Sequence, residues 1–311
     1  MKNKYEEWEK HQLLLKESHE KIAEKLSGKT IAYIDIPVHF NVGDLLIYHG
    51  TEAFLKNNRL NVIYRSDIFN LDKECLDKVD LILFHGGGNF GDLYPKIHNK
   101  RIGIIDKYKH KEIIVLPQSV HFNSLSNRDE TEKVLKSHPN LTMYVRDEDS
   151  FFWLKDLSVN VDMMPDMAHS LYPIHSENTV KRSYNKNLVL RRVDIESKIG
   201  VDNLEKDIVT FDWFELITKL DKLNAKLYRL LSRTPISQNF LARYWYFASK
   251  IIINRAIDYF NKYQQVDTDR LHGLIFSNLL YKEVIVRDNS YGKNSKYYLA
   301  WLKGTSNIKM K

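Results

Sequence analysis

Apolar residues in this sequence fall into short runs, separated by stretches in which they recur at helical spacing. Five runs rich in Val, Ile, Leu and Tyr, most without polar alternation, lie at 30–37, 61–66, 79–86, 112–119 and 141–147. Unbroken runs of this kind are typical of parallel strands that helices cover on both faces. Between the first two lies "DLLIYHGTEAFLKNN", an expected helix with Asp44 as its N-cap. This order of strand, helix and strand predicts a doubly wound α/β domain.

A polar, turn-rich segment at 171–187 interrupts the pattern, and a second α/β unit follows it. Its expected strands lie at 188–194, 263–269 and 283–288, with an expected helix at 270–281. We therefore predict a Rossmann-like domain with a leading helix at 1–180 and a second Rossmann-like domain at 181–311, with the junction within 175–186.

Residues 213–262 depart from this alternation, because the segment is helical in pattern, aromatic and basic. The simpler interpretation is a helical insertion that packs on the core. The alternative is a surface that contacts a membrane or a lipid-linked substrate, since basic residues interleaved with Trp, Tyr and Leu suit an interfacial helix. No run approaches the roughly 18 apolar residues that a spanning helix needs.

Composition narrows the classes of partner. The chain has 311 residues and a formal net charge of +7, which favours a phosphorylated metabolite, a nucleic acid or an anionic membrane surface. Nucleic acid is the weakest of these, because basic residues are scattered among acidic ones and no recognition module is present. The single cysteine, Cys75, excludes a disulfide framework and fits a reducing cytoplasm. We expect a cytoplasmic protein, with peripheral contact at the inner face of the membrane as the alternative.

The glycine loop "HGGGNFGD" follows the expected strand at 79–86. Its spacing Gly86-x-Gly88-x-x-Gly91 formally satisfies the dinucleotide fingerprint. That fingerprint requires a helix to begin at once, yet Pro95 stands where the helix should already be under way. The favoured interpretation is a turn at a strand end, in which glycines supply positive φ angles.

An anion site is predicted at the start of the helix at 270–281. Thr268 or Asp269 is the expected cap, which places Arg270 and His272 in the first turn, where unpaired N–H groups and the helix dipole favour anions. This point lies at the carboxyl edge of the sheet, where ligands of α/β domains bind. The alternative is a surface ion pair at Arg270 and a packing histidine at 272.

Polar residues also follow strands of the first domain. Arg146 ends one strand and precedes a helix that Asp147 or Asp149 is expected to cap. Further polar groups at strand ends are Gln118, Ser119, His121, Asp166 and His169, and a strand-end acid such as Asp166 is either a base or a cap. The "DTD" at 267–269 is interpreted as capping and not as a metal site. No Cys/His metal spacing, Walker loop or nucleophile elbow is convincing.

In order, "NVGDLLIYHG", "FHGGGNFGDLY", "LPQSVHF", "VRDEDSF", "PDMAHSL" and "TDRLHGLIFSNLL" resemble the polysaccharide pyruvyl transferase family over about residues 31–290. The resemblance implies two Rossmann-like halves in a GT-B-like arrangement. It implies phosphoenolpyruvate as donor, without a separate cofactor or a metal. The implied acceptor is a sugar hydroxyl pair on a cell-surface polysaccharide or its lipid-linked precursor, and the product is a pyruvate ketal.

The resemblance also assigns roles. Arg146 and Arg270 match the family's donor-binding arginines, His272 is the natural acid/base, and Asp166 is a weaker candidate for activating the sugar hydroxyl. Other expected substrate-binding residues are Asn41, Gly43, Asp44, Gly87, Gly88, Asn89, Gln118 and Ser119. Two alternatives stay open: a GT-B-type glycosyltransferase with a nucleotide-sugar donor, and a non-catalytic glycan-binding or membrane-associated protein.

Overall fold

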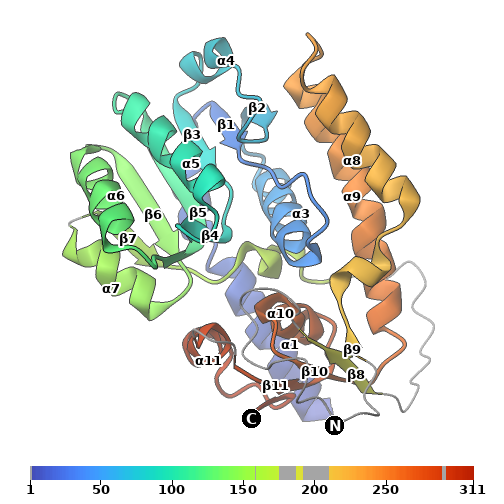
Figure 1. Cartoon of the computed structure of the whole chain (residues 1–311). Helices are drawn as coiled ribbons and strands as arrows, with labels where there is room; N and C mark the ends of the chain where they lie inside the picture. The colour runs from blue at the N-terminus through green and yellow to red at the C-terminus, as the bar shows by residue number, and fades with distance from the viewer. Residues whose placement is uncertain (1, 158, 175–186, 192–209, 289–291) are drawn as a thin grey trace.

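The protein is known from a computed structural model that describes residues 2–157, 159–174, 187–191, 210–288 and 292–311 (Figure 1). The first half forms a parallel sheet that has seven strands among these residues. Six follow the order β2-β1-β3-β5-β6-β7, and β4 pairs with the end of β5. The strands are β1 (Ile31–Ile34), β2 (Val62–Ser66), β3 (Leu81–Phe84), β4 (Gly87–Gly91), β5 (Glu112–His121), β6 (Leu141–Val145) and β7 (Asn160–Met163). The five strands predicted for this half are confirmed.

The second half forms a smaller parallel sheet, with five strands in the described part of the chain and the order β12-β11-β10-β8-β9. Its strands are β8 (Asn187–Leu190), β9 (Thr210–Phe211), β10 (Gln265–Thr268), β11 (Glu283–Val286) and β12 (Ile308–Met310). The helix α10 (Leu271–Leu279) connects β10 to β11, as predicted, and α11 (Lys293–Tyr297) and η4 (Tyr298–Leu302) precede β12.

Helices cover both faces of the first sheet (Figure 1). Neighbouring residues of one strand enter different cores: Ile31 and Tyr33 pack on the side of α3, whereas Ala32 and Ile34 pack on the side of α5. This double burial is why the strands are continuous apolar runs. After the leading helix, the helices of this half are α2 (Glu20–Leu26), α3 (Val42–Asn57), α4 (Lys73–Asp77), α5 (Pro95–Lys107), α6 (Leu125–Ser137), α7 (Glu148–Asp156) and the short η1 (Met167–Leu171).

Two predicted helix caps are wrong. Asn41, and not Asp44, caps α3, because its side-chain oxygen accepts a hydrogen bond from the Gly43 N–H at 3.0 Å. Neither Thr268 nor Asp269 caps α10; Arg270 occupies the cap position without a side-chain cap bond. The predicted cap of α7 is confirmed, because Asp147 accepts from the Ser150 N–H at 2.9 Å.

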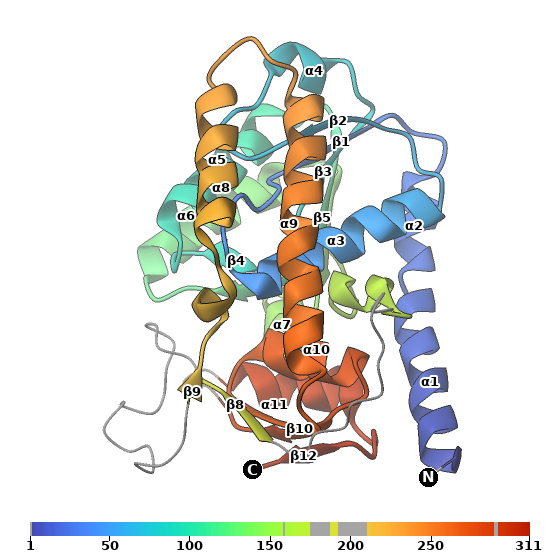
Figure 2. The same ribbon diagram turned by 90° about the vertical axis from the view of Figure 1, so that its right-hand side faces the viewer.

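The segment at 213–262 forms η3 (Trp213–Leu216) and a hairpin of α8 (Lys219–Leu231) and α9 (Gln238–Phe260), which lie side by side in Figure 2. The hairpin packs on the first half of the chain. The Trp245 indole N–H donates to the Pro37 carbonyl at 2.7 Å, and the Tyr48 hydroxyl donates to the Ala242 carbonyl at 3.3 Å. The predicted helical insertion is therefore confirmed, and its core is shared with the first sheet.

The leading helix, α1 (Lys2–Glu17), belongs to the first half but contacts the second half. The Trp8 indole donates to the Asn278 carbonyl at 2.8 Å. The two halves are thus linked by helices in both directions. The junction predicted at 175–186 lies outside the described residues, and the division at residue 180 and the GT-B-like arrangement stay predictions. Among the helices that the structure describes, none has the length and apolar content that a membrane span requires.

Candidate active site

A cavity of about 410 Å³ opens between the two sheets. This volume is in the range of small-metabolite sites. Both halves of the chain contribute walls: His39, Asn41, Asp44, Gly88, Asn89, Tyr94, Ile97 and Arg146 from the first, and Asp212, Trp213, Phe214, Arg270, Leu271, His272 and Lys293 from the second. Arg146, Arg270 and His272, which were predicted at separate strand ends, thus meet in one place.

Arg146 is a buried cation that follows directly on β6 and is only 2% exposed. Its Nε donates to the Ser119 hydroxyl at 2.9 Å, and its Nη1 donates to the Asp166 carboxylate at 2.5 Å. Its Nη2 lies against Gly88, where an added β-carbon would approach to 3.0 Å. Two partners therefore fix the guanidinium through Nε and Nη1, and its Nη2 lies toward the glycine loop at the cavity wall.

Arg270 is the corresponding cation of the second half. Its Nη2 donates to the Asp212 carboxylate at 2.5 Å, and its Nε donates to the Arg191 carbonyl at 3.4 Å. It occupies the N-cap position of α10, so the unpaired N–H groups of the first helical turn lie beside it. Two oriented guanidinium groups and a helix N-terminus therefore give the cavity a strong preference for an anionic ligand.

His272 lies in the first turn of α10 and stands between the two halves. Its Nε2 is 3.3 Å from the Asp166 carboxylate, and its Nδ1 side packs against Gly43 of α3. The side chain is 13% exposed and lines the cavity, so the imidazole is accessible to a ligand while Asp166 orients its Nε2.

Asp166 joins these groups from behind the cavity wall. It is fully buried; one carboxylate oxygen accepts from the Ala168 N–H at 2.9 Å, and the other contacts both Arg146 and His272. Burial alone would raise the pKa of Asp166, but the positive charges of His272 and Arg146 and these hydrogen bonds lower it well below its usual range. The Asp166 side chain is therefore a carboxylate, and it fixes the positions of Arg146 and His272 relative to each other.

The glycine loop forms a short strand, β4, and does not lead directly into a helix as the dinucleotide fingerprint requires. Gly87 and Gly91 have φ angles of 122° and 121°, as the predicted need for positive φ requires, and no helix begins until Pro95. At Gly91 an added β-carbon would lie 1.8 Å from the His121 carbonyl oxygen, so this position accepts glycine alone. The loop brings Gly88 and Asn89 to the cavity wall.

Comparison with known proteins identifies this arrangement. Residues 41–291 match the model of the polysaccharide pyruvyl transferase family. The chain belongs to this family. It is 33% identical over 304 residues to "Putative pyruvyl transferase EpsO" of Bacillus subtilis strain 168, with 93% of each chain covered. It is 26% identical over 299 residues to "Pyruvyl transferase 1" of Schizosaccharomyces pombe, covering 89% of this chain and 70% of that protein.

A solved structure shares the fold. The crystal structure of an uncharacterized protein of Klebsiella pneumoniae superposes with a TM-score of 0.64 at 23% identity, and the match covers 97% of each chain. The resemblance inferred from the order of motifs is therefore confirmed at the level of the family, which supports pyruvyl transfer onto a polysaccharide.

The residues predicted for this pyruvyl transferase divide into two layers. Those that line the cavity are Asn41, Asp44, Gly88, Asn89, Arg146, Arg270 and His272. The remaining ones, Gly43, Gly87, Gln118, Ser119 and Asp166, lie behind them; Ser119 accepts from Arg146, and the Gln118 amide donates to Asn89 at 3.4 Å. The rear layer therefore orients the residues that a ligand would touch.

Two further predicted histidines do not line the cavity. His169 is fully buried and hydrogen-bonds the Tyr297 hydroxyl at 2.9 Å; burial lowers its pKa to about 3, so it is neutral at physiological pH. His121 lies on a separate surface depression beside Phe122 and Trp153. Neither is positioned to exchange a proton with a ligand in this pyruvyl transferase cavity.

Sequence reasoning missed the second-half wall at 212–214, including the carboxylate that fixes Arg270. Asp212 forms a capping box with Glu215, a local pattern that the sequence does display, but its ion pair with Arg270 joins residues 58 positions apart. It also missed His39, whose Nε2 lies 3.6 Å from the Asp44 carboxylate. No spacing rule connects such partners, so only the fold reveals them.

Proposed function

We propose that this chain transfers the pyruvyl group of phosphoenolpyruvate to two hydroxyls of one sugar, in a cell-surface polysaccharide or its lipid-linked precursor. The observation that carries the proposal is the convergence of Arg146 and Arg270, from different halves, on one cavity beside His272. Phosphoenolpyruvate carries a carboxylate next to a phosphate, and both groups pair well with planar guanidinium groups. The donor therefore matches the charge of the site.

The reaction needs one proton donor and one proton acceptor. His272 gives a proton to C3, which becomes the methyl group, while C2 gains oxocarbenium character and bonds the first sugar oxygen. The bond from C2 to the bridging oxygen breaks, phosphate leaves, and the second sugar oxygen closes the ketal. One hydroxyl proton restores His272, and the other passes from the proton acceptor to the departing phosphate, which leaves as hydrogen phosphate, so atoms and charge balance. The arginines offset the charge of the departing phosphate, and the proposal requires no metal or separate cofactor.

The proton acceptor for the sugar hydroxyl is better assigned to Asp44 than to Asp166. Asp166 is fully buried and both of its oxygens are in contact with protein groups, so it acts as a positioning residue for Arg146 and His272. Among the described cavity-lining residues the carboxylates are Asp44 and Asp212, and Asp212 is held by Arg270. Asp44 therefore has the access that this step needs.

The test separates this proposal from its two rivals. The protein is titrated with phosphoenolpyruvate and, separately, with uridine diphosphate; tighter binding of uridine diphosphate in the donor cavity would favour a nucleotide-sugar glycosyltransferase. The protein is then incubated with phosphoenolpyruvate and candidate lipid-linked oligosaccharides, and phosphate release and the mass of the glycan are followed. Donor binding without phosphate release for any acceptor would favour a non-catalytic binding protein.

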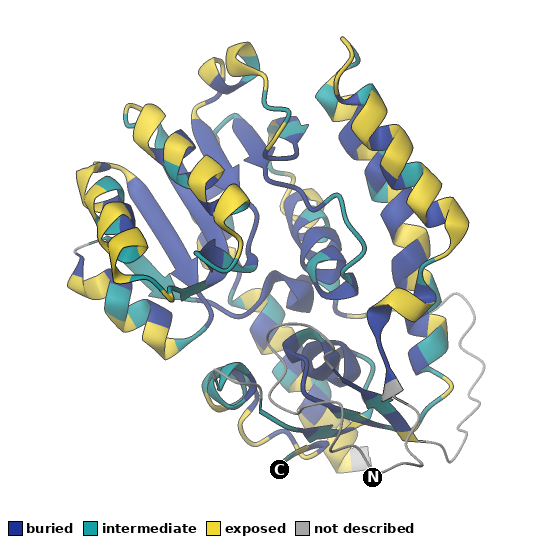
Figure 3. Ribbon diagram, viewed as in Figure 1, coloured by how far each residue is buried: buried dark blue, intermediate teal, exposed yellow. Residues whose placement is uncertain are grey.

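We also propose that the protein works at the inner face of the membrane, through α8. Leu220, Leu223, Leu227 and Leu230 recur at helical spacing and are 40 to 60% exposed, so they form an exposed apolar stripe. Figure 3 shows that exposed residues run along the outer side of α8. Lys219, Lys222 and Lys226 form a parallel stripe one position earlier, and all three are exposed. Leucines beside lysines on one solvent face are typical of helices that lie in an anionic membrane surface.

A further inference from the structure

A second cavity, of about 440 Å³, adjoins the donor cavity. The two share four wall residues, His39, Asp44, Asn89 and Ile97. The second cavity extends from this shared wall, past the ends of β1 and β2, to helix α8 of the hairpin. A molecule that occupies it would therefore contact the same Asp44 and His39 that face the donor.

The floor of the second cavity is polar and hydrogen-bonded. Asp35 accepts from the buried Arg101 Nε at 2.5 Å, and Asp67 accepts from the Tyr228 hydroxyl at 3.1 Å. Phe69, on the same wall, is 57% exposed. Asp67 also accepts from the Phe69 N–H and the Asn70 amide, so the carboxylates hold the floor in place. The exposed aromatic ring beside these polar groups suits a sugar, which presents C–H groups on its face.

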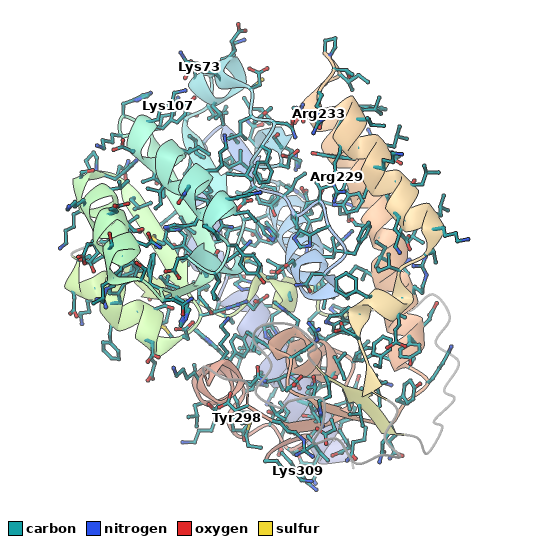
Figure 4. The ribbon with its side chains drawn as sticks, in the orientation of Figure 1. Lys73, Lys107, Arg229, Arg233, Tyr298 and Lys309 are labelled. Atoms are coloured by element: carbon teal, nitrogen blue, oxygen red, sulfur yellow. The ribbon has the colours of Figure 1, made fainter. Side chains whose placement is uncertain are left out.

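The rim of the second cavity is basic. Arg229 lies in the last turn of α8 and Arg233 in the turn that follows the helix, and both line the cavity (Figure 4). The Arg229 Nη2 donates to the Val38 carbonyl at 3.1 Å, which draws this side chain over the opening. No carboxylate among the described residues pairs with either side chain. Two such guanidinium groups on one rim recognise a group that carries several negative charges and several acceptor oxygens.

We propose that the second cavity binds a sugar diphosphate, with the sugar toward the shared wall and the diphosphate at Arg229 and Arg233. The proposal rests on the proposed function, because the sugar is then the acceptor of the pyruvyl group. It gives the acceptor a chemical class: a glycan still attached to its carrier through a diphosphate. The carrier is either a polyprenyl lipid or a nucleotide, and both present the same diphosphate to the rim.

The experiment measures binding of inorganic pyrophosphate by calorimetry. The double variant Arg229→Gln/Arg233→Gln is expected to bind it about tenfold more weakly than the unaltered protein, the loss typical of one or two exposed charge-assisted bonds. Lys219→Gln/Lys222→Gln removes the same charge from the same helix, away from the cavity, and is expected to leave the affinity unchanged. Equal losses in both variants, or no loss in either, would overturn the proposal.

Phosphoenolpyruvate titrations on the same proteins separate this proposal from the proposed function. Arg270→Ala should weaken the binding of phosphoenolpyruvate and leave that of pyrophosphate unchanged. Arg229→Gln/Arg233→Gln should weaken the binding of pyrophosphate and leave that of phosphoenolpyruvate unchanged. If pyrophosphate binding depends on Arg270 and not on Arg229 and Arg233, pyrophosphate binds in the donor cavity. That result would overturn the inference. A protein that binds pyrophosphate at the rim but never binds phosphoenolpyruvate would instead contradict only the proposed donor. Titrations with geranyl diphosphate and uridine diphosphate identify the carrier as the class that binds more tightly. The variant Arg229→Gln/Arg233→Gln should weaken binding of that ligand.

Discussion

Gly43 and His272 touch across the two halves of the chain, and a β-carbon built on Gly43 would lie 2.4 Å from the imidazole Nδ1. Real β-carbons do not approach other atoms so closely, so any larger side chain at position 43 must displace the imidazole. The same imidazole contacts the Asp166 carboxylate through Nε2. A glycine on α3 thus fixes the place of the proposed acid on α10.

We expect Gly43→Ala to lower turnover by about 100-fold, because a displacement of about 1 Å in a reacting group has that effect. The affinity for phosphoenolpyruvate should change far less, since Arg146 and Arg270 do not contact position 43. Rates of phosphate release and donor titrations measure the two quantities. Gly103→Ala in α5 is the matched control, because no atom lies within 4 Å of its added β-carbon. Equal rates for both variants would remove the contact from the mechanism.

Arg270→Ala should weaken phosphoenolpyruvate binding by about 1.5–3 kcal/mol, the usual contribution of a hydrogen bond to a charged group. Arg270→Lys should restore little of this loss, because an ammonium cannot form the two parallel bonds of a guanidinium. Calorimetric titration measures both. Arg128→Ala, which removes an exposed arginine paired with Glu132 on α6, is the control for a general loss of positive charge. Unchanged donor affinity in the alanine variant would exclude Arg270 from the site.

His272→Gln should lower turnover by about 10²–10⁴-fold, the range of general acid–base catalysis, while donor affinity is largely kept. His121→Gln, at a histidine outside both cavities, should leave the rate unchanged. Pre-steady-state phosphate release compares the variants. A normal rate for His272→Gln would transfer the proton-donor role to another cavity-lining group such as His39, because His169 is buried and neutral.

Much of the fold was predictable because burial on both faces leaves a direct mark on the sequence. The strands β1 and β3 are unbroken apolar runs, and β6 is interrupted only by Thr142; Arg146 follows β6, so its place at the sheet edge could be predicted. The same reasoning placed Arg270 and His272 at the start of α10. Position along a strand thus predicts which edge a residue occupies.

Side-chain direction and long-range packing could not be predicted in this way. Asp166 follows β7 as predicted, but only the fold shows that its carboxylate points inward to Arg146. The periodicity of α9 reveals an apolar face without naming its partner, and the bond from Trp245 to Pro37 spans 208 positions. The cap of α3 was misassigned because Asn41 and Asp44 are both favourable cap residues in the same short stretch.

Asp166→Asn should destabilise the protein in a pH-dependent way. The pKa of Asp166 is held well below the ordinary value of 3.8, so the carboxylate stabilises the fold fully above that pH. This stabilisation is lost as the pH falls below about 4 toward the lowered pKa. At pH 7 the variant leaves Arg146 buried without its counter-charge, and we expect a loss of about 3–5 kcal/mol in the free energy of unfolding.

Urea denaturation between pH 7 and pH 3 measures this difference, which should shrink as the pH falls. Asp162→Asn is the control, because its carboxylate is half-exposed and pairs with Lys21 at 3.8 Å, so the change should be small at every pH. A difference at Asp166 that does not depend on pH would indicate that the shape of the side chain matters and its charge does not.

Helix α8 should bind anionic vesicles. Its exposed leucine stripe supplies apolar area, and each lysine near an anionic leaflet contributes about 1 kcal/mol at modest salt. We expect co-sedimentation with vesicles that contain phosphatidylglycerol, weaker at high salt, and none with vesicles of phosphatidylcholine alone.

Lys219→Glu/Lys222→Glu should reduce binding much more than Arg243→Glu/Lys250→Glu, which makes the same charge change on α9. Leu223→Ser/Leu227→Ser should reduce it at every salt concentration, because this variant removes apolar area and no charge. Protein that stays in the supernatant at low salt would contradict docking, and a change of oligomeric state in the leucine variant without any lipid binding would identify the stripe as a contact between two copies of the chain.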